Sequence, residues 1–146
     1  MMENDSDFNR WKTHIRAGNS CFKNRQILAA ISHYKEAEFQ ARCLIGSSPN
    51  KSGAIAALIA SHHNLAEIYR REQEPQLCEQ SLSNSLRVIN ELLVEFADDT
   101  ETYLALLHGK NTAYCALLHY QKTTLEVSSL TPDLMQCSSS HKATLN

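Results

Sequence analysis

The sequence predicts an all-α fold organised as a single domain. Only four glycines and three prolines punctuate its 146 residues, and they fall where helices have to begin or end. Between them, apolar residues recur at spacings of three and four, which places them along one face of a helix. The length suits one domain with a substantial core and is too short for two domains of ordinary size.

Five helices are expected, of which the first three cover the amino-terminal half. The first spans residues 5–21, because Asp5 and its neighbours carry side-chain oxygens that can cap exposed amides. The second spans residues 25–45 along one apolar stripe, and the glycine, serines and proline of residues 46–50 then interrupt it. The third spans residues 51–71.

The fourth and fifth helices follow in the carboxy-terminal half. The fourth, residues 75–96, begins at Pro75, whose fixed φ and missing N–H are tolerated in a first turn. The fifth, residues 98–125, is indicated by Asp98 with Glu101 three positions later, which is a capping-box arrangement. Each of these helices carries apolar residues at helical spacing.

The sequence divides into a helical domain and a tail. We expect the helical domain to occupy residues 1–126. Residues 127–146 are rich in serine, contain Pro132 and show no sustained apolar period. Because they offer little surface to bury, we expect them to form a mostly disordered tail.

Composition and charge exclude several classes of protein. The formal net charge is −2 without a like-charged block, so we expect neither a nucleic-acid nor a membrane-surface partner. No apolar run approaches the roughly 18 residues of a membrane span, and the amino terminus lacks the pattern of a secretory signal. The five cysteines are scattered and odd in number, which suits a reducing compartment. A soluble, cytoplasmic protein is therefore expected.

An internal repeat with a constant offset of 48 residues relates the first pair of helices to the second. Under this offset the corresponding residues are Ala17 and Leu65, Ala30 and Cys78, Ala37 and Ser85, and His14 and His62. A further shift of 48 carries Leu58 onto Leu106 and Leu65 onto Ala113. A third repeat therefore begins and stops, which predicts two helical hairpins followed by a closing helix.

The pattern of small and aromatic residues in these hairpins resembles the tetratricopeptide repeat family. The agreeing positions, within residues 8–125, are Gly18, Ala30, Tyr34, Ala37, Ala66 and Tyr69. The chain departs from the family in its period, 48 residues instead of 34, and so resembles a long-helix variant, of the kind found in short uncharacterised bacterial proteins. The resemblance implies a right-handed superhelix in which Gly18 allows close helix packing and Tyr34 fills the gap between hairpins.

The resemblance also implies a concave groove, lined by the first helix of each repeat, that binds extended peptides or chain termini. The groove positions are Lys12, Arg16, Asn19, His63, Asn64, Glu67, Arg70 and Arg71, together with Ile15 and Phe22. Asn19 and Asn64 correspond to family asparagines that hold a peptide, whereas Ile15 stands where the family's carboxylate clamp has a lysine. A protein-interaction adaptor is the leading prediction, and a merely solvated polar face is the alternative.

The fifth helix is apolar over more than one face, so something has to cover it. Its candidate self-association residues are Leu107, Tyr114, Leu117 and Tyr120. The alternative function is accordingly a homodimer or larger homo-oligomeric scaffold. A terminal helix that simply caps the array is the simplest explanation of the same pattern.

Two adjacent histidines raise the question of a metal or catalytic site. Neighbouring helical residues point about 100° apart, so His62 and His63 cannot chelate one ion together. His62 occupies an inward position and is expected to pack. His63 shares a face with Glu67, but a third ligand is missing from this helix. No catalytic signature stands out either, so we expect no cofactor, no metal and no enzyme, with a His63–Glu67 metal or enzymatic site as the less favoured alternative.

Overall fold

The computed structural model describes residues 2–130, and describes side chains for residues 7–127. It contains five α-helices, which confirms the all-α fold with two hairpins and a further helix. Their bounds are α1 (Met2–Lys23), α2 (Ile27–Ser47), α3 (Lys51–Arg71), α4 (Pro75–Glu95) and α5 (Thr100–Leu130). No β-strand occurs in these residues. No helix in this part of the chain is long and apolar enough to cross a membrane.

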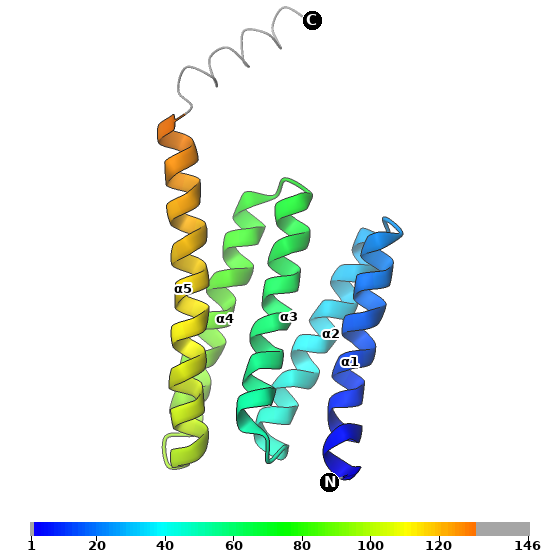
Figure 1. Cartoon of the computed structure of the whole chain (residues 1–146), viewed down its shortest axis with the longest axis vertical. Coiled ribbons are helices and arrows are strands. Elements are labelled where there is room, and N and C mark those ends of the chain that lie inside the picture. Colours follow the sequence, from blue (N-terminus) through cyan, green and yellow to red (C-terminus); the bar gives the residue numbers. More distant parts are fainter. Residues whose placement is uncertain (1, 131–146) are drawn as a thin grey trace, which may run out of the picture.

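The helices form two layers (Figure 1). Helices α1, α3 and α5 lie side by side in one layer, and α2 and α4 lie behind them. Each helix packs against the one that follows it, and α3 also contacts α1 and α5. The side of α1, α3 and α5 that faces away from α2 and α4, which carries Arg16, Glu67 and Thr112, is called the front face below. The α1–α2 and α3–α4 turns lie at the same end of the molecule.

The core follows the 48-residue repeat found in the sequence. Corresponding positions are buried in both hairpins: Ala30 and Cys78, Tyr34 and Leu82, Ala37 and Ser85, and Ala41 and Ile89. The incomplete third repeat obeys the same offset, because Leu58 and Leu106 are both fully buried. Leu65 and Ala113 are also both buried. The sequence repeat is therefore a repeat of packing.

The two hairpin turns also share one backbone conformation. Arg25 and Gln73, 48 residues apart, both have positive φ, at 65° and 59°. The N–H of Gln26 donates to the Cys21 carbonyl at 2.8 Å, and that of Glu74 donates to the Tyr69 carbonyl at 2.8 Å. This is the pattern of a Schellman motif, in which a left-handed residue ends the helix. It also explains why α2 begins two residues later than predicted, since Arg25 cannot belong to it.

Close packing at Gly18 agrees with its predicted role. A Cβ atom at Gly18 would lie 2.5 Å from Cε1 of Tyr34, so α1 and α2 approach each other more closely than a side chain would permit. The Tyr34 ring also packs with Leu65 and Ile68 of α3, between the two hairpins. Its hydroxyl donates a hydrogen bond to Oδ1 of Asn19.

Helix α5 differs from its prediction at both ends. The cap residue is Asp99 and not Asp98, because the N–H of Thr102 donates to Asp99 Oδ1 at 3.3 Å and its hydroxyl donates to Asp99 Oδ2 at 2.7 Å. The helix starts one residue later than predicted, since Phe96 and the next residues form an extra turn after α4. It then continues to Leu130, so residues 127–130 of the predicted tail are helical. The remaining tail, 131–146, lies outside the described residues.

Candidate functional site

The predicted groove residues line the front face along two helices. Lys12, Arg16 and Asn19 follow one another at spacings of three and four on α1, which places them on one side of that helix. On α3, His63, Glu67 and Arg70 do the same, and Arg71 lies four residues after Glu67. Two depressions of different chemistry open on this face, and each is lined by some of these residues.

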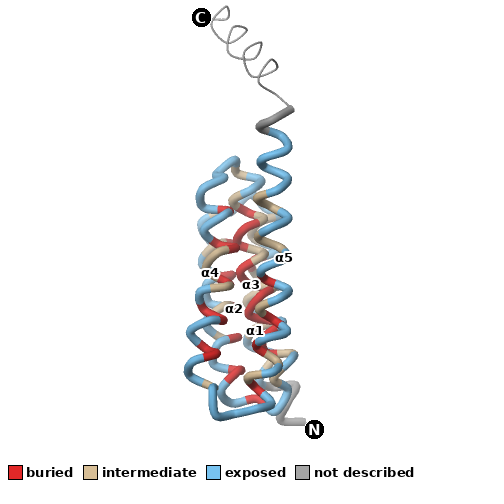
Figure 2. The backbone as a smooth tube through the Cα atoms, turned by 90° about the vertical axis from the view of Figure 1, so that its left-hand side faces the viewer, coloured by how far each residue is buried: buried red, intermediate tan, exposed pale blue. Residues whose placement is uncertain are grey.

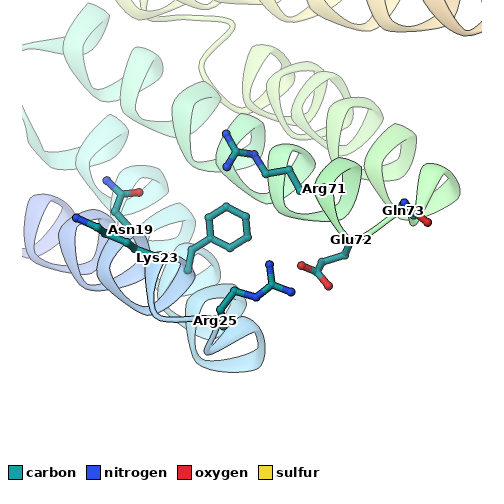
Figure 3. Close-up of a pocket in the computed structure, with 7 residues that line it drawn as sticks. Asn19, Lys23, Arg25, Arg71, Glu72 and Gln73 are labelled. Atoms are coloured by element: carbon teal, nitrogen blue, oxygen red, sulfur yellow. The ribbon is translucent and has the colours of Figure 1, made fainter.

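The first depression, called the tip pocket, lies where the two hairpin turns approach each other (Figure 3). It has a volume of about 630 Å³ and is lined by Asn19, Phe22, Lys23, Arg25, Arg71, Glu72 and Gln73. Three of these side chains are cationic and one is anionic. Lys23 and Arg25 are exposed and form no ion pair within the described part of the chain. The tip pocket therefore offers positive charge to a ligand.

Glu67 organises the cations of α3. It accepts two hydrogen bonds from Arg70, at 2.8 and 2.7 Å, and one from Nε of Arg71 at 2.7 Å. These bonds, that of Arg70 first, lower the pKa of Glu67 to about 2. The Arg71 guanidinium carbon lies 5.4 Å from the centroid of the Phe22 ring on α1, which is a cation–π contact. Arg71 is thus held at the edge of the tip pocket from both helices.

The second depression, called the α3–α5 cleft, runs between those two helices and is mostly apolar. Its volume is about 320 Å³, and its lining consists of Ser52, Ile55, Ala56, Ile59, Ala60 and His63 from α3 with Ala105, His108, Gly109 and Thr112 from α5. A Cβ atom at Gly109 would lie 2.5 Å from Cγ2 of Ile55, so the two helices touch beneath the cleft. Above this contact, the short alanine side chains leave room for an apolar group.

His63 places a polar atom in this apolar cleft. Its Nε2 atom is buried without a hydrogen-bond partner within the described residues. Burial, followed by the neighbouring His62, lowers the pKa of His63, so the ring is neutral at pH 7. A neutral imidazole carries one donor and one acceptor nitrogen. The wall of the cleft therefore holds a neutral histidine with one buried nitrogen that the described residues leave without a hydrogen bond.

The second histidine of the pair has a different environment. His62 is buried, as predicted for a packing position, and its Nε2 lies 3.4 Å from Oε1 of Glu38 on α2. The close approach of His62 is the main cause that lowers the pKa of Glu38, although Nε2 of His62 lacks a hydrogen bond of regular geometry within the described residues. The carboxylate of Glu67, the predicted partner of His63, already accepts hydrogen bonds from Arg70 and Arg71. Residues 7–127 hold no group of three or more His, Cys, Asp and Glu residues suited to a metal ion.

The predicted self-association residues of α5 divide into two pairs. Leu107 and Tyr114 are exposed. Leu117 and Tyr120 instead face inward and pack against Ala66, Cys78 and Leu82, and the Tyr120 hydroxyl donates to the Pro75 carbonyl at 3.1 Å. The inward pair belongs to the fold and cannot form an exposed contact surface. The exposed large apolar residues of this helix outside the predicted self-association set are Leu104, Leu118, Leu125 and Val127.

Other residues of the front face were also missed. Lys23, the last residue of α1, and the turn residues Arg25 and Gln73 were not selected because the resemblance assigns groove positions only to earlier residues of the first helix of each repeat. The repeat could have indicated them, since Arg25 and Gln73 are related by the same offset of 48. The α5 wall of the cleft was missed because its small residues, such as Ala105 and Gly109, have no distinctive chemistry.

Comparison with known proteins places the chain in one family. No curated protein and no solved structure matches it. The family described as "Protein of unknown function (DUF2753)" matches residues 9–143, which is nearly the whole chain. The match includes all the helices that line the tip pocket and the α3–α5 cleft, so this face lies within the shared domain. The protein therefore belongs to the DUF2753 family.

Proposed function

We propose that the front face binds an extended segment of another protein, and that the protein acts as a non-enzymatic interaction module. The segment carries an apolar side chain that enters the α3–α5 cleft and an acidic group that meets the cations of the tip pocket. The tetratricopeptide-like pattern of the sequence supports the same kind of role. The observation that carries the proposal is the pairing of these two depressions on one face.

The spacing of the two depressions suits a short extended peptide. His63 in the cleft and Arg71 at the tip pocket are eight residues apart on α3, which corresponds to about 12 Å along the helix. An extended chain advances about 3.3 Å per residue, so about four peptide residues cover this distance. Asn64 directly follows His63 on α3 and is partly exposed, and its amide can both donate to and accept from a peptide backbone.

Charge complementarity favours an acidic partner. Lys23 and Arg25 have no carboxylate partner within the described residues, while Arg71 shares Glu67 with Arg70. A carboxylate from an acidic side chain or a chain terminus would be attracted by these groups. The attraction is expected to weaken as salt concentration rises, because the groups are exposed.

Selection from a random peptide library tests the proposal directly. Peptides retained by the immobilised protein are expected to share an aliphatic residue about four positions from an acidic group. For a selected peptide, replacing Asn64→Ala and Arg71→Ala together should weaken binding by more than about tenfold, as measured by fluorescence anisotropy.

A matched control is available on α4. Arg87 resembles Arg71, because both side chains are 59% exposed and each donates to a glutamate at 2.7 Å. The double variant Arg87→Ala with Asn90→Ala removes the same groups from the other layer and should leave peptide affinity unchanged. Failure to enrich any peptide, or equal affinity for the front-face variant and the wild type, would contradict the proposal.

A further inference from the structure

Helix α5 carries a second feature, an apolar stripe on the side opposite its buried face. The stripe, called the α5 seam, consists of Leu104, Leu107, Asn111, Tyr114, Leu118 and Leu125. Its five apolar side chains are between 40% and 69% exposed. At 3.6 residues per turn, the six positions fall within a sector of about 80°. This is a continuous surface and not a scatter of single exposed residues.

The seam lies at the open edge of the array. The opposite side of α5 is buried against α3 and α4 through Thr102, Leu106, Gly109 and Ala113. Among residues 2–130, helix α5 is the last helix of its layer (Figure 1), and the view onto this edge shows it mostly exposed (Figure 2). A helical repeat array requires a polar terminal surface to remain unpaired. The α5 seam does not meet that requirement.

The spacing along the seam is that of a helix that pairs with another helix. From Leu104 to Leu118 its positions alternate between steps of three and four, and the average of 3.5 residues is the heptad period. Leu125 follows one heptad after Leu118, and the position between them is the polar Gln121, which donates to Glu79 of α4 at 2.9 Å. Leu104, Asn111, Leu118 and Leu125 occupy one heptad position, and Leu107 and Tyr114 occupy the other. Leu104 and Leu125 are 21 positions apart on the helix, which corresponds to about 32 Å. Its ideal occupant is therefore a helix of similar length.

Asn111 and the absence of charge in the α5 seam indicate which helix pairs with it. None of the six seam positions carries a charge, so the surface offers nothing to attract a charged partner. A single asparagine in such a seam fixes the register of paired helices when it meets another amide. In a parallel pair, the Asn111 side chains of two copies face each other and can exchange hydrogen bonds. A second copy supplies both the apolar surface and the matching amide.

Residues 131–146, which lie outside the described structure, match the seam poorly in sequence. As a helix, these sixteen residues would be about 24 Å long, shorter than the seam. The middle of that segment, Gln136–Lys142, contains no large apolar side chain. We propose that a second copy of the protein covers the α5 seam, forming a two-fold homodimer that leaves both front faces free.

Sedimentation velocity over a range of concentrations tests the proposal. The wild-type protein is expected to be a dimer that dissociates on dilution. Replacing Leu107→Glu and Leu118→Glu together should weaken dimerisation by at least about 100-fold, because two carboxylates would enter an apolar interface. Circular dichroism should show unchanged helix content, since both residues are exposed in one copy.

Matched variants separate this interface from other surfaces. Leu28→Glu with Val94→Glu changes two exposed apolar residues outside α5, 84% and 80% exposed, and should leave the dimer intact. Asn111→Leu should tighten association at least about tenfold, because the polar position lowers the stability of such a seam. An unchanged dissociation constant in that variant would show that Asn111 does not lie in the interface, and would overturn the proposed register.

The tail is tested in the full chain. Leu134→Ser with Met135→Ser should leave the dimer unaffected. A wild-type protein that stays monomeric at all concentrations overturns the proposal, and so does a dimer that survives the two glutamates. A monomer that dimerises only after the tail substitutions would mean that the tail covers the seam.

Discussion

At Gly18 the absence of a Cβ atom allows α1 and α2 to pack closely. A Cβ atom there would lie 2.5 Å from Cε1 of Tyr34, well inside ordinary van der Waals contact. The Tyr34 ring has little freedom to move, because it also packs between α2 and α3 and its hydroxyl is bonded to Asn19. The tetratricopeptide-like pattern predicted a small residue at this position, and the geometry gives the reason.

Replacing Gly18→Leu should therefore lower the free energy of unfolding by about 1–3 kcal/mol, the usual cost of overpacking. Thermal or urea denaturation measures the change. Gly46→Leu is the matched control, because a Cβ atom at Gly46 meets nothing within 4 Å and leucine has the better helix propensity. If both variants were equally stable, the close contact between α1 and α2 would be wrong.

Glu67 makes the stability of the protein depend on pH. Its pKa is lowered from an ordinary value of 4.5 to about 2 by the hydrogen bonds of Arg70 and Arg71. A lowered carboxyl pKa contributes stability above pH 4.5, and this contribution is lost as the pH falls toward 2. Because the side chain is 40% exposed, solvent screens the pair and the effect stays below about 1 kcal/mol.

Replacing Glu67→Gln should flatten the dependence of stability on pH between 4.5 and 2. Denaturation midpoints measured across this range provide the test. The conservative change keeps the size of the side chain, so the packing around Phe22 and Arg71 is retained. A variant that loses stability toward acid as steeply as the wild type would show that Glu67 is not the responsible group.

The start of α5 illustrates what fixes the end of an element. Asp99 accepts from both the N–H and the hydroxyl of Thr102, which holds the first turn of the helix. Two adjacent aspartates precede this turn, and both satisfy the sequence pattern of a cap. The extra turn after Phe96 decides between them, and it depends on how α4 ends.

Replacing Asp99→Ala is expected to lower the melting temperature by a few degrees, since the exposed amides of the first turn lose their partner. Asp98→Ala should have almost no effect, because its side chain makes no hydrogen bond within the described residues. Scanning calorimetry of the two variants compares them directly. A larger loss in the Asp98 variant would restore the original assignment of the cap.

The elements differ in how well the sequence predicts them. The bounds of α3 match the prediction at both ends. The Asn50 side chain caps its start, and the turn at Gln73, which has positive φ, follows its end. Helix α5 is apolar on more than one face, so periodicity cannot tell the inward residues Leu117 and Tyr120 from the exposed ones. Only the positions of α3 and α4 decide which stripe is buried.

For the whole molecule, the 48-residue repeat was the most informative property of the sequence. It predicts two equivalent hairpins, and the structure repeats both their buried positions and their turns at Arg25 and Gln73. The candidate site was only partly predictable. The helical positions along α1 and α3 follow from the repeat, whereas the tip pocket and the α3–α5 cleft arise from contacts between helices that are distant in sequence.

The central claim, that the front face is the binding surface, is tested most directly by nuclear magnetic resonance. Amide chemical shifts of the labelled protein are followed as a selected peptide is added. We expect the largest changes at Asn19, His63 and Arg71, with α2 and α4 unaffected on their outer sides. Changes confined to α2 and α4, or to the α5 seam, would contradict the assignment of binding to the front face.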